Sequence, residues 1–318
     1  MLSNNASIDN DAAIVFPEQQ GDRRLYAIAH LGVLTIAGTD AATFLQGQIT
    51  CNINDISDTQ SSLGAICNPK GKVISTFLLV KDGDTFLMVL PQALLAAVQK
   101  KLQMYVLRAD VRLIDSSDER CLIGLRDGEP QVDDAQKSAF ATTRQASIAV
   151  DFDKRRLLIA TFEQAQSIWS EQLTLGFVPE SSAQWHYFDI IAGMPWLTAA
   201  TSEEFIPQML NLDKLGGISF NKGCYTGQEI VARTHYLGKA KRELFVAECP
   251  ISEPPEPNAS IIDDSGDAEQ SAGKVLCAEN RGNSCYLLIV LQVSDSHRYS
   301  LRLKDRSDKL TLLTASTL

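Results

Sequence analysis

The chain has 318 residues, a formal net charge of −10 at pH 7 and a sequence pI near 4.9. This length is enough for two or three domains, each with its own hydrophobic core. The acidic balance excludes a protein that holds nucleic acid by general electrostatic attraction, because neutralising phosphates needs a surplus of Lys and Arg. We therefore expect no direct nucleic acid binding.

Nothing in the sequence predicts export or membrane insertion. The start, MLSNNASIDNDAAIVF, lacks a basic stretch followed by an apolar one, and the longest apolar runs are broken by Pro91, Gln92 and Gln99. The cysteines form no CxxC pair and have no His at zinc-finger spacing. They stand at positions 51, 67, 121, 224, 249, 277 and 285. These features predict a cytoplasmic, monomeric protein with reduced thiols and no bound metal.

The first part of the chain alternates between strand and helix patterns. The predicted elements are a strand at Leu31–Ala37, a helix over 41–49 capped by Asp40, a hairpin of 63–68 and 72–80, a strand over 85–90, an amphipathic helix over 93–107 opened by Pro91, and a strand over 110–115. This order predicts an α+β unit with an antiparallel sheet.

A second passage repeats this style and a third is rich in β patterns. The second predicts strands over 147–152 and 156–162 and helices over 163–173 and 183–193, the last capped from Ser181 or Ser182. The third predicts short strands over 242–249, 273–280, 285–293, 299–304 and 309–315. We expect these strands to form a small antiparallel barrel or sandwich.

The segment KGCYTGQE, Lys222–Glu229, carries a candidate functional cysteine. Thr226 and Glu229 stand three apart before an apolar pair, which is the spacing of a capping box, so we expect a helix to begin at about Gly227. The glycines on both sides of Cys224 permit positive φ or close approach of another molecule. A cysteine just before a helix start is favoured as a thiolate by free N–H groups and the helix dipole.

Basic residues surround this cysteine in an otherwise acidic chain. They are Lys222, Arg233, His235, Lys239, Lys241 and Arg242. Their field would favour the thiolate further and would attract an anionic ligand. The same residues also fit a buried structural cysteine beside a solvated basic face. No His or Asn partner can be assigned for a papain-like nucleophile, and His235 is a candidate proton partner.

At these residues the chain resembles a known family. KGCYTGQE, with the blocks DAATFLQGQIT, CNPKGKV and IAGMPW…FIPQMLNLDKLGGISF, is similar to the YgfZ family of tRNA-modifying, folate-binding proteins. These are relatives of the glycine-cleavage aminomethyltransferase, or T-protein, and of mitochondrial iron–sulfur assembly factors. The matching blocks run from about Leu31 to Arg242.

The resemblance implies an α+β fold with three parts. Residues 1–240 would form a T-protein-like region of two α+β subdomains that divide near 115–145, and residues 241–318 a C-terminal β-barrel. The three parts would form a ring around a channel that holds tetrahydrofolate or another folate. The implied role is that of an accessory protein that supports iron–sulfur cluster assembly or repair, and thereby methylthiolation of some tRNAs. Its expected partners are iron–sulfur enzymes or assembly proteins.

The resemblance also assigns residues. Cys224 maps onto the functionally critical thiol of the family, and Trp185 onto an aromatic of the folate site that can stack on the pterin. Leu31 stands where the family commonly has a second Trp. Lys222 and Arg233 are the basic residues expected to bind the folate. Gln46 and Gln48 would line the channel or form an ordinary helix face.

The T-protein relatives carry an acidic pair that this chain lacks. By the order of blocks, Ser75 and Thr76 stand at those places, and neither hydroxyl can act as a carboxylate base. Glycine-cleavage activity is therefore not expected. Two alternatives to the accessory role stay open. One is a folate-dependent one-carbon transferase that uses Cys224. The other is a thiol redox sensor in which Cys51 or Cys67 lies near Cys224 in space.

Overall fold

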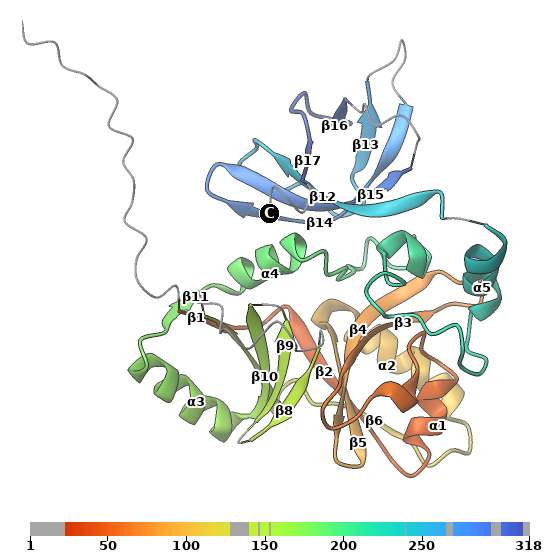
Figure 1. Ribbon diagram of the computed structural model, residues 1–318, viewed down its shortest axis with the longest axis vertical. Coiled ribbons are helices and arrows are strands. Elements are labelled where there is room, and N and C mark those ends of the chain that lie inside the picture. The colour runs from red at the N-terminus through yellow and green to blue at the C-terminus, as the bar shows by residue number, and fades with distance from the viewer. Residues whose placement is uncertain are drawn as a thin grey trace, which may run out of the picture.

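The computed structural model describes residues 23–127, 140–145, 147–152, 154–238, 240–264, 270–293 and 300–313. In these residues the strands form one five-stranded sheet and two six-stranded sheets (Figure 1). We call them the N-terminal, middle and C-terminal sheets. The strand pairs are antiparallel apart from the pair β1–β11. The predicted α+β class is confirmed. The expected division near 115–145 includes residues 128–139, which lie outside the described residues.

The N-terminal sheet has the strand order β3-β4-β5-β2-β6. Its strands are β2 (Leu31–Ala37), β3 (Ser62–Cys67), β4 (Val73–Asp82), β5 (Thr85–Pro91) and β6 (Arg112–Asp115). Leu34 and Ile36 of β2 face the core under helix α2 (Gln92–Val106), whereas Val33 faces the core shared with the middle sheet. Successive strand residues point to opposite faces, so β2 is buried on both sides.

The middle sheet has the order β11-β1-β7-β10-β9-β8. Its strands are β1 (Arg24–Ala27), β7 (Arg120–Arg126), β8 (Thr142–Arg144), β9 (Ile148–Phe152), β10 (Arg155–Thr161) and β11 (Val178–Glu180). Helix α3 (Phe162–Thr174) packs on its outer face, and a capping box between Thr161 and Gln164 starts that helix. Strand β1 precedes β2 in the chain, so the first two sheets are interleaved.

The C-terminal sheet has the order β16-β13-β14-β15-β12-β17 and is curved. Its strands are β12 (Arg242–Cys249), β13 (Ser260–Asp263), β14 (Gln270–Arg281), β15 (Ser284–Gln292), β16 (Leu301–Leu303) and β17 (Thr311–Leu313). In Figure 1 it lies above helix α4 (Ser182–Ile191), on the opposite side of that helix from the other two sheets. Leu288 and Val290 pack toward the rest of the chain, whereas Leu287 and Ile289 fill the inner face of the curved sheet.

A long irregular segment, residues 192–227, runs from α4 to helix α5 (Gln228–Leu237) and contains the short helix η3 (Pro207–Leu210). Its backbone pairs with the N-terminal sheet, because Val73 N–H donates to Phe205 O at 2.8 Å and Glu203 N–H to Val73 O at 2.7 Å. Asn211 Nδ2 donates to Leu244 O of β12 at 2.9 Å. The segment therefore joins two sheets before it reaches Cys224.

One predicted cap is wrong. Helix α1 (Ala41–Gln46) follows Asp40, but no side chain among the described residues caps it. The Asp40 carboxylate instead accepts a hydrogen bond from Asp110 N–H at 2.8 Å. The helix also ends three residues earlier than the predicted 41–49.

Candidate functional site

The loop that carries Cys224 packs against the turn between β3 and β4. Gly227 has φ +84°, and a Cβ there would lie 2.5 Å from Asn68 O and 2.9 Å from Gly71 Cα. Only glycine satisfies both the left-handed backbone and the close approach. In Figure 1, α5 accordingly lies at the side of the molecule beside β3.

The predicted capping box at Thr226 and Glu229 is wrong, although the helix does begin within one residue of the predicted position. Helix α5 starts at Gln228 with Gly227 as its N-cap, and no side chain of the described residues caps it. Thr226 instead turns toward α1, with its Oγ1 3.5 Å from Gln48 Oε1 and its N–H donating to Gly47 O at 3.4 Å. These contacts tie the loop to the end of α1.

Lys222 holds the other side of the loop. Its Nζ donates to Ile49 O at 2.6 Å and to Cys51 O at 2.8 Å, and it lies 5.0 Å from the centre of the Tyr225 ring. Burial lowers the pKa of Lys222 to about 8. The ammonium group predicted to bind a ligand is thus engaged by two backbone carbonyls.

Cys224 itself is exposed. All seven cysteines lie in described parts of the chain; Cys121 is half-buried and the other five are buried. A Cβ at the neighbouring Gly223 would meet no atom within 4 Å, so space is open beside the thiol. The loop therefore presents one accessible thiol on a backbone fixed at both ends.

The two cysteines nearest this loop are poor partners for thiol chemistry. Burial raises the pKa of Cys51 and of Cys67 to about 12. Gly227 packs on Cys67, since its Cβ would lie 3.1 Å from Cys67 Cβ. Because thiolates are the reactive form, both side chains act here as small core hydrophobes.

Known proteins resemble this chain over most of its length. No protein-family model matches the sequence. The tRNA-modifying protein YgfZ of Colwellia psychrerythraea strain 34H is 30% identical over 295 residues, covering 90% of each chain. The protein of the same name from an Escherichia coli O157:H7 strain is 31% identical over 288 residues, covering 87% of this chain and 88% of that one. This chain belongs to the YgfZ family.

A solved structure shares the fold of this YgfZ family member. The glycine cleavage system aminomethyltransferase T of Bartonella henselae matches with a TM-score of 0.72 over 93% of this chain and 86% of that one. The sequence identity is 14%, so this likeness concerns the fold alone. The T-protein-like architecture expected from the sequence is confirmed.

The two residues assigned to folate from the YgfZ resemblance lie in the core. Trp185 of α4 is 1% exposed, and a Cβ at Gly124 would lie 2.3 Å from its ring. Tyr26 meets this ring edge-on at 5.5 Å, and the Arg155 guanidinium lies 4.6 Å from it. Leu31 belongs to the same buried cluster. Neither side chain offers a free face in this structure.

A buried polar network beside Trp185 was not found from the sequence. Arg155 Nη1 donates to Asp189 Oδ1 at 2.7 Å, and Trp196 Nε1 donates to Asp189 Oδ2 at 2.9 Å. Burial disfavours the charged Asp189, but Arg155 and His30 outweigh it and lower the pKa of Asp189. No local pattern could have linked these residues, since Arg155 and Asp189 are 34 positions apart.

The other residues named in the sequence analysis lie as follows. Ser75 and Thr76 are buried, and their hydroxyls donate to Thr76 O at 2.9 Å and Pro195 O at 2.6 Å, so both are used inside the core. Gln46 bridges Asn52 and Ile53 and is thereby structural. Arg233 is exposed on α5. Lys239 lies outside the described residues.

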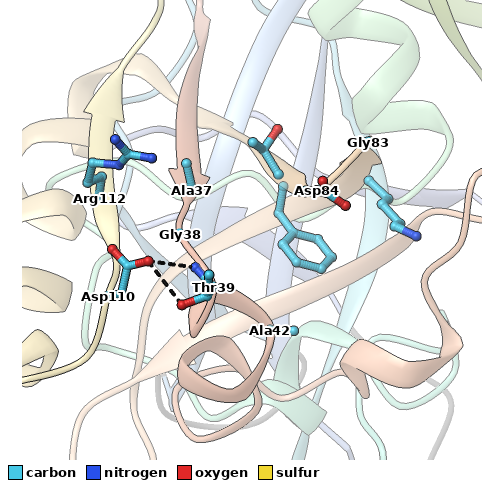
Figure 2. A pocket seen from close by; sticks show the side chains of 11 residues that line it. Ala37, Gly38, Thr39, Ala42, Gly83, Asp84, Asp110 and Arg112 are labelled. Carbon is cyan, nitrogen blue, oxygen red and sulfur yellow. Dashed lines mark hydrogen bonds between the residues drawn. The ribbon is translucent and has the colours of Figure 1, made fainter.

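Among the cavities between described residues are two that none of the predicted ligand residues lines. One, of about 600 Å³, opens at the edge of the N-terminal sheet (Figure 2), where the Asp110 carboxylate accepts from Thr39 N–H and Oγ1 at 3.0 Å each. The other, of about 270 Å³, lies between the end of α4, Asn211 and strands β12, β15 and β17. The Asn211 Oδ1 is buried and has no hydrogen-bond partner among the described residues.

Two kinds of feature are absent from the described residues. Among them no helix has the length and apolar character needed to cross a membrane. Within the same residues, no three His, Cys, Asp or Glu side chains gather as a metal site would require.

Proposed function

We propose that this protein acts in tRNA modification as an accessory factor, and that Cys224 is the residue through which it acts. Its relatives are named tRNA-modifying proteins. In this account it supports assembly or repair of iron–sulfur clusters in the cytoplasm, and thereby methylthiolation of some tRNAs. A net charge of −10 favours this indirect route over direct contact with RNA.

The observation that carries the proposal is the geometry of the Lys222–Gly227 loop. Lys222 fixes one end to the segment that follows α1 and Gly227 fixes the other to the β3–β4 turn, and Cys224 alone among the cysteines is exposed between them. A thiol held on a rigid loop in open space suits contact with another macromolecule or with a cluster that it carries.

The alternatives receive less support. A one-carbon transferase needs a group to act on the folate nitrogen, and the hydroxyls of Ser75 and Thr76 are buried and bonded to backbone carbonyls. A redox sensor needs a resolving thiol, and burial raises the pKa of both Cys51 and Cys67 to about 12.

Folate binding is a separate part of the proposal. The four residues predicted to bind folate are poorly placed for it in this structure. Trp185 and Leu31 are buried, the Lys222 ammonium donates to backbone carbonyls, and Arg233 lies on the outer face of α5. The cavity at Asn211 is the other candidate, since Asn211 lines it and its Oδ1 has no hydrogen-bond partner among the described residues. Its volume of about 270 Å³ lies just below the roughly 300–1,000 Å³ of drug-sized pockets, so it would hold part of a folate. The proposed role of Cys224 does not depend on this folate.

Complementation separates these functions. A strain without the native gene receives wild-type protein, Cys224→Ala or Cys121→Ser, and the activity of an iron–sulfur enzyme is measured. The proposal expects loss with Cys224→Ala and retention with Cys121→Ser. Turnover of an aminomethyl donor by the purified protein would support the transferase instead.

A further inference from the structure

The last turn of helix α5 carries two exposed apolar side chains beside the half-buried ring of Phe220. Tyr236 is 65% exposed and Leu237 is 81% exposed. The His235 ring stacks on Phe220 at 3.7 Å with an interplanar angle of 14°, and both rings lie edge-on to Tyr236. Exposed apolar groups that cluster in this way mark binding surfaces more often than single exposed residues do.

This patch is continuous with the cysteine loop. Phe220 precedes Cys224 by four residues, and α5 begins directly after the loop. Along α5 the buried residue is Val231, whereas Arg233, Tyr236 and Leu237 follow one another at the spacing of a single helix face. That outer face is therefore directed away from the sheet on which the helix packs.

The surroundings of the patch are basic apart from two exposed carboxylates, Glu229 four residues before Arg233 on α5 and Glu203 beside Asn68. Arg233 lies on the same face, Lys70 stands in the turn that packs on the first turn of α5, and Lys241 follows the helix at the start of β12. All three are exposed, and none forms an ion pair within the described residues. Although the chain as a whole has a net charge of −10, these local cations favour a partner whose contact face is negatively charged.

We propose that Phe220, Arg233, His235, Tyr236 and Leu237, together the α5 surface, form the docking site for a protein partner whose contact face is apolar at its centre and bears carboxylates at its edge. Aromatic residues and Arg are the side chains enriched at protein interfaces, and Tyr is prominent among those that carry binding energy. The inference rests on the proposed function, because it supplies the surface by which a partner is brought to Cys224.

Photocrosslinking in cells tests the surface. A benzophenone amino acid replaces Tyr236, or Phe162 as a control, which is 60% exposed on α3. We expect one partner protein to be crosslinked at position 236 and none at position 162. The crosslinked peptide of that partner should be rich in Asp and Glu. Arg233→Glu should reduce the yield about tenfold, as expected for an interface Arg. Equal crosslinking at both positions, or a crosslinked species that ribonuclease removes, would overturn the proposal.

Complementation gives the second readout. The variant Tyr236→Ser/Leu237→Ser should lose tRNA methylthiolation, whereas Leu173→Ser/Leu175→Ser, at exposed positions on and after α3, should keep it. Wild-type methylthiolation in the first variant, together with loss in Cys224→Ala, would overturn the docking surface and leave the proposed function standing. Crosslinking at position 236 does not need the thiol, so its persistence in Cys224→Ala supports the surface even where the role of Cys224 fails.

Discussion

Lys222 Nζ donates a hydrogen bond of 2.8 Å to the backbone carbonyl of Cys51, across 171 positions of sequence. With the second bond, to Ile49 O, it ties the Cys224 loop to the segment that follows α1. The thiol is therefore positioned by a lysine that the sequence pattern assigned to ligand binding.

Replacing Lys222 with Met should loosen the loop. Two carbonyls lose their donor, which costs about 1–3 kcal/mol in the free energy of unfolding. Lys214→Met is the matched control, because Lys214 makes only an exposed pair with Glu243, and such pairs contribute roughly 0–1 kcal/mol. Urea unfolding measures both variants. Equal losses in the two would show that the Lys222 contacts do not hold the loop.

Gly227→Ala should destabilise the protein more than Gly176→Ala. Both glycines have φ near +85°, but a Cβ at Gly227 meets Asn68 O at 2.5 Å whereas one at Gly176 meets nothing within 4 Å. Each substitution brings backbone strain of about 1–3 kcal/mol, and Gly227→Ala adds a steric clash. The difference in thermal unfolding midpoint reports that clash. No difference would contradict the packing of the loop on the β3–β4 turn.

Acid should weaken the fold through Asp189. Its pKa in the folded state lies below the value of about 3.9 for an unfolded chain, because Arg155 and His30 outweigh its burial. The stability it contributes is therefore present above about pH 4 and is lost as the pH falls through the folded pKa. Asp189→Asn should cost about 3–5 kcal/mol at pH 7 and flatten the acid dependence.

The control for Asp189 removes both charges. Arg155→Met/Asp189→Leu leaves no buried unpaired charge, so it should lose less stability than Asp189→Asn. Chemical unfolding at pH 7 and at pH 3 measures both variants. An unchanged acid dependence in Asp189→Asn would mean that another carboxyl causes it.

Asn211→Gly should weaken folate binding. Glycine tolerates the φ of +55° at this position, so the change removes the amide without adding backbone strain. Loss of one hydrogen bond, about 1 kcal/mol, corresponds to roughly fivefold in Kd. Titration with a folate by calorimetry measures it, with Glu203→Gly, also at positive φ, as control. Equal affinity in both variants would remove the Asn211 cavity as the folate site.

Local patterns predicted much of the fold. The strands β2 and β12 and the helix α2 were found to within one residue, because alternation or helical spacing and turn residues agree there. Strand β1 was missed, since its four residues become a strand by pairing with β7, about a hundred positions later, and with β11, about 150 positions later. Such pairings leave no mark in local sequence.

For the site too, local features were predicted but contacts between distant residues were not. The cysteine loop was predicted from its glycines and basic residues together with the family resemblance, but the atoms that hold it were not. Thr226 has the spacing of a cap, yet it contacts Gly47 and also Gln48, which lies 178 positions earlier in the sequence. The Trp185 ring packs against Gly124 and Arg155, and these two residues come close to it only through sheet pairing.

The most direct test of the central claim is the level of methylthiolated tRNA in a strain that lacks the native gene. Nucleoside analysis by mass spectrometry compares cells carrying the wild-type chain, Cys224→Ser or Cys121→Ser at equal protein levels. We predict that methylthiolation with Cys224→Ser falls to the level of the empty strain, while Cys121→Ser matches wild type. Wild-type levels with Cys224→Ser would contradict it.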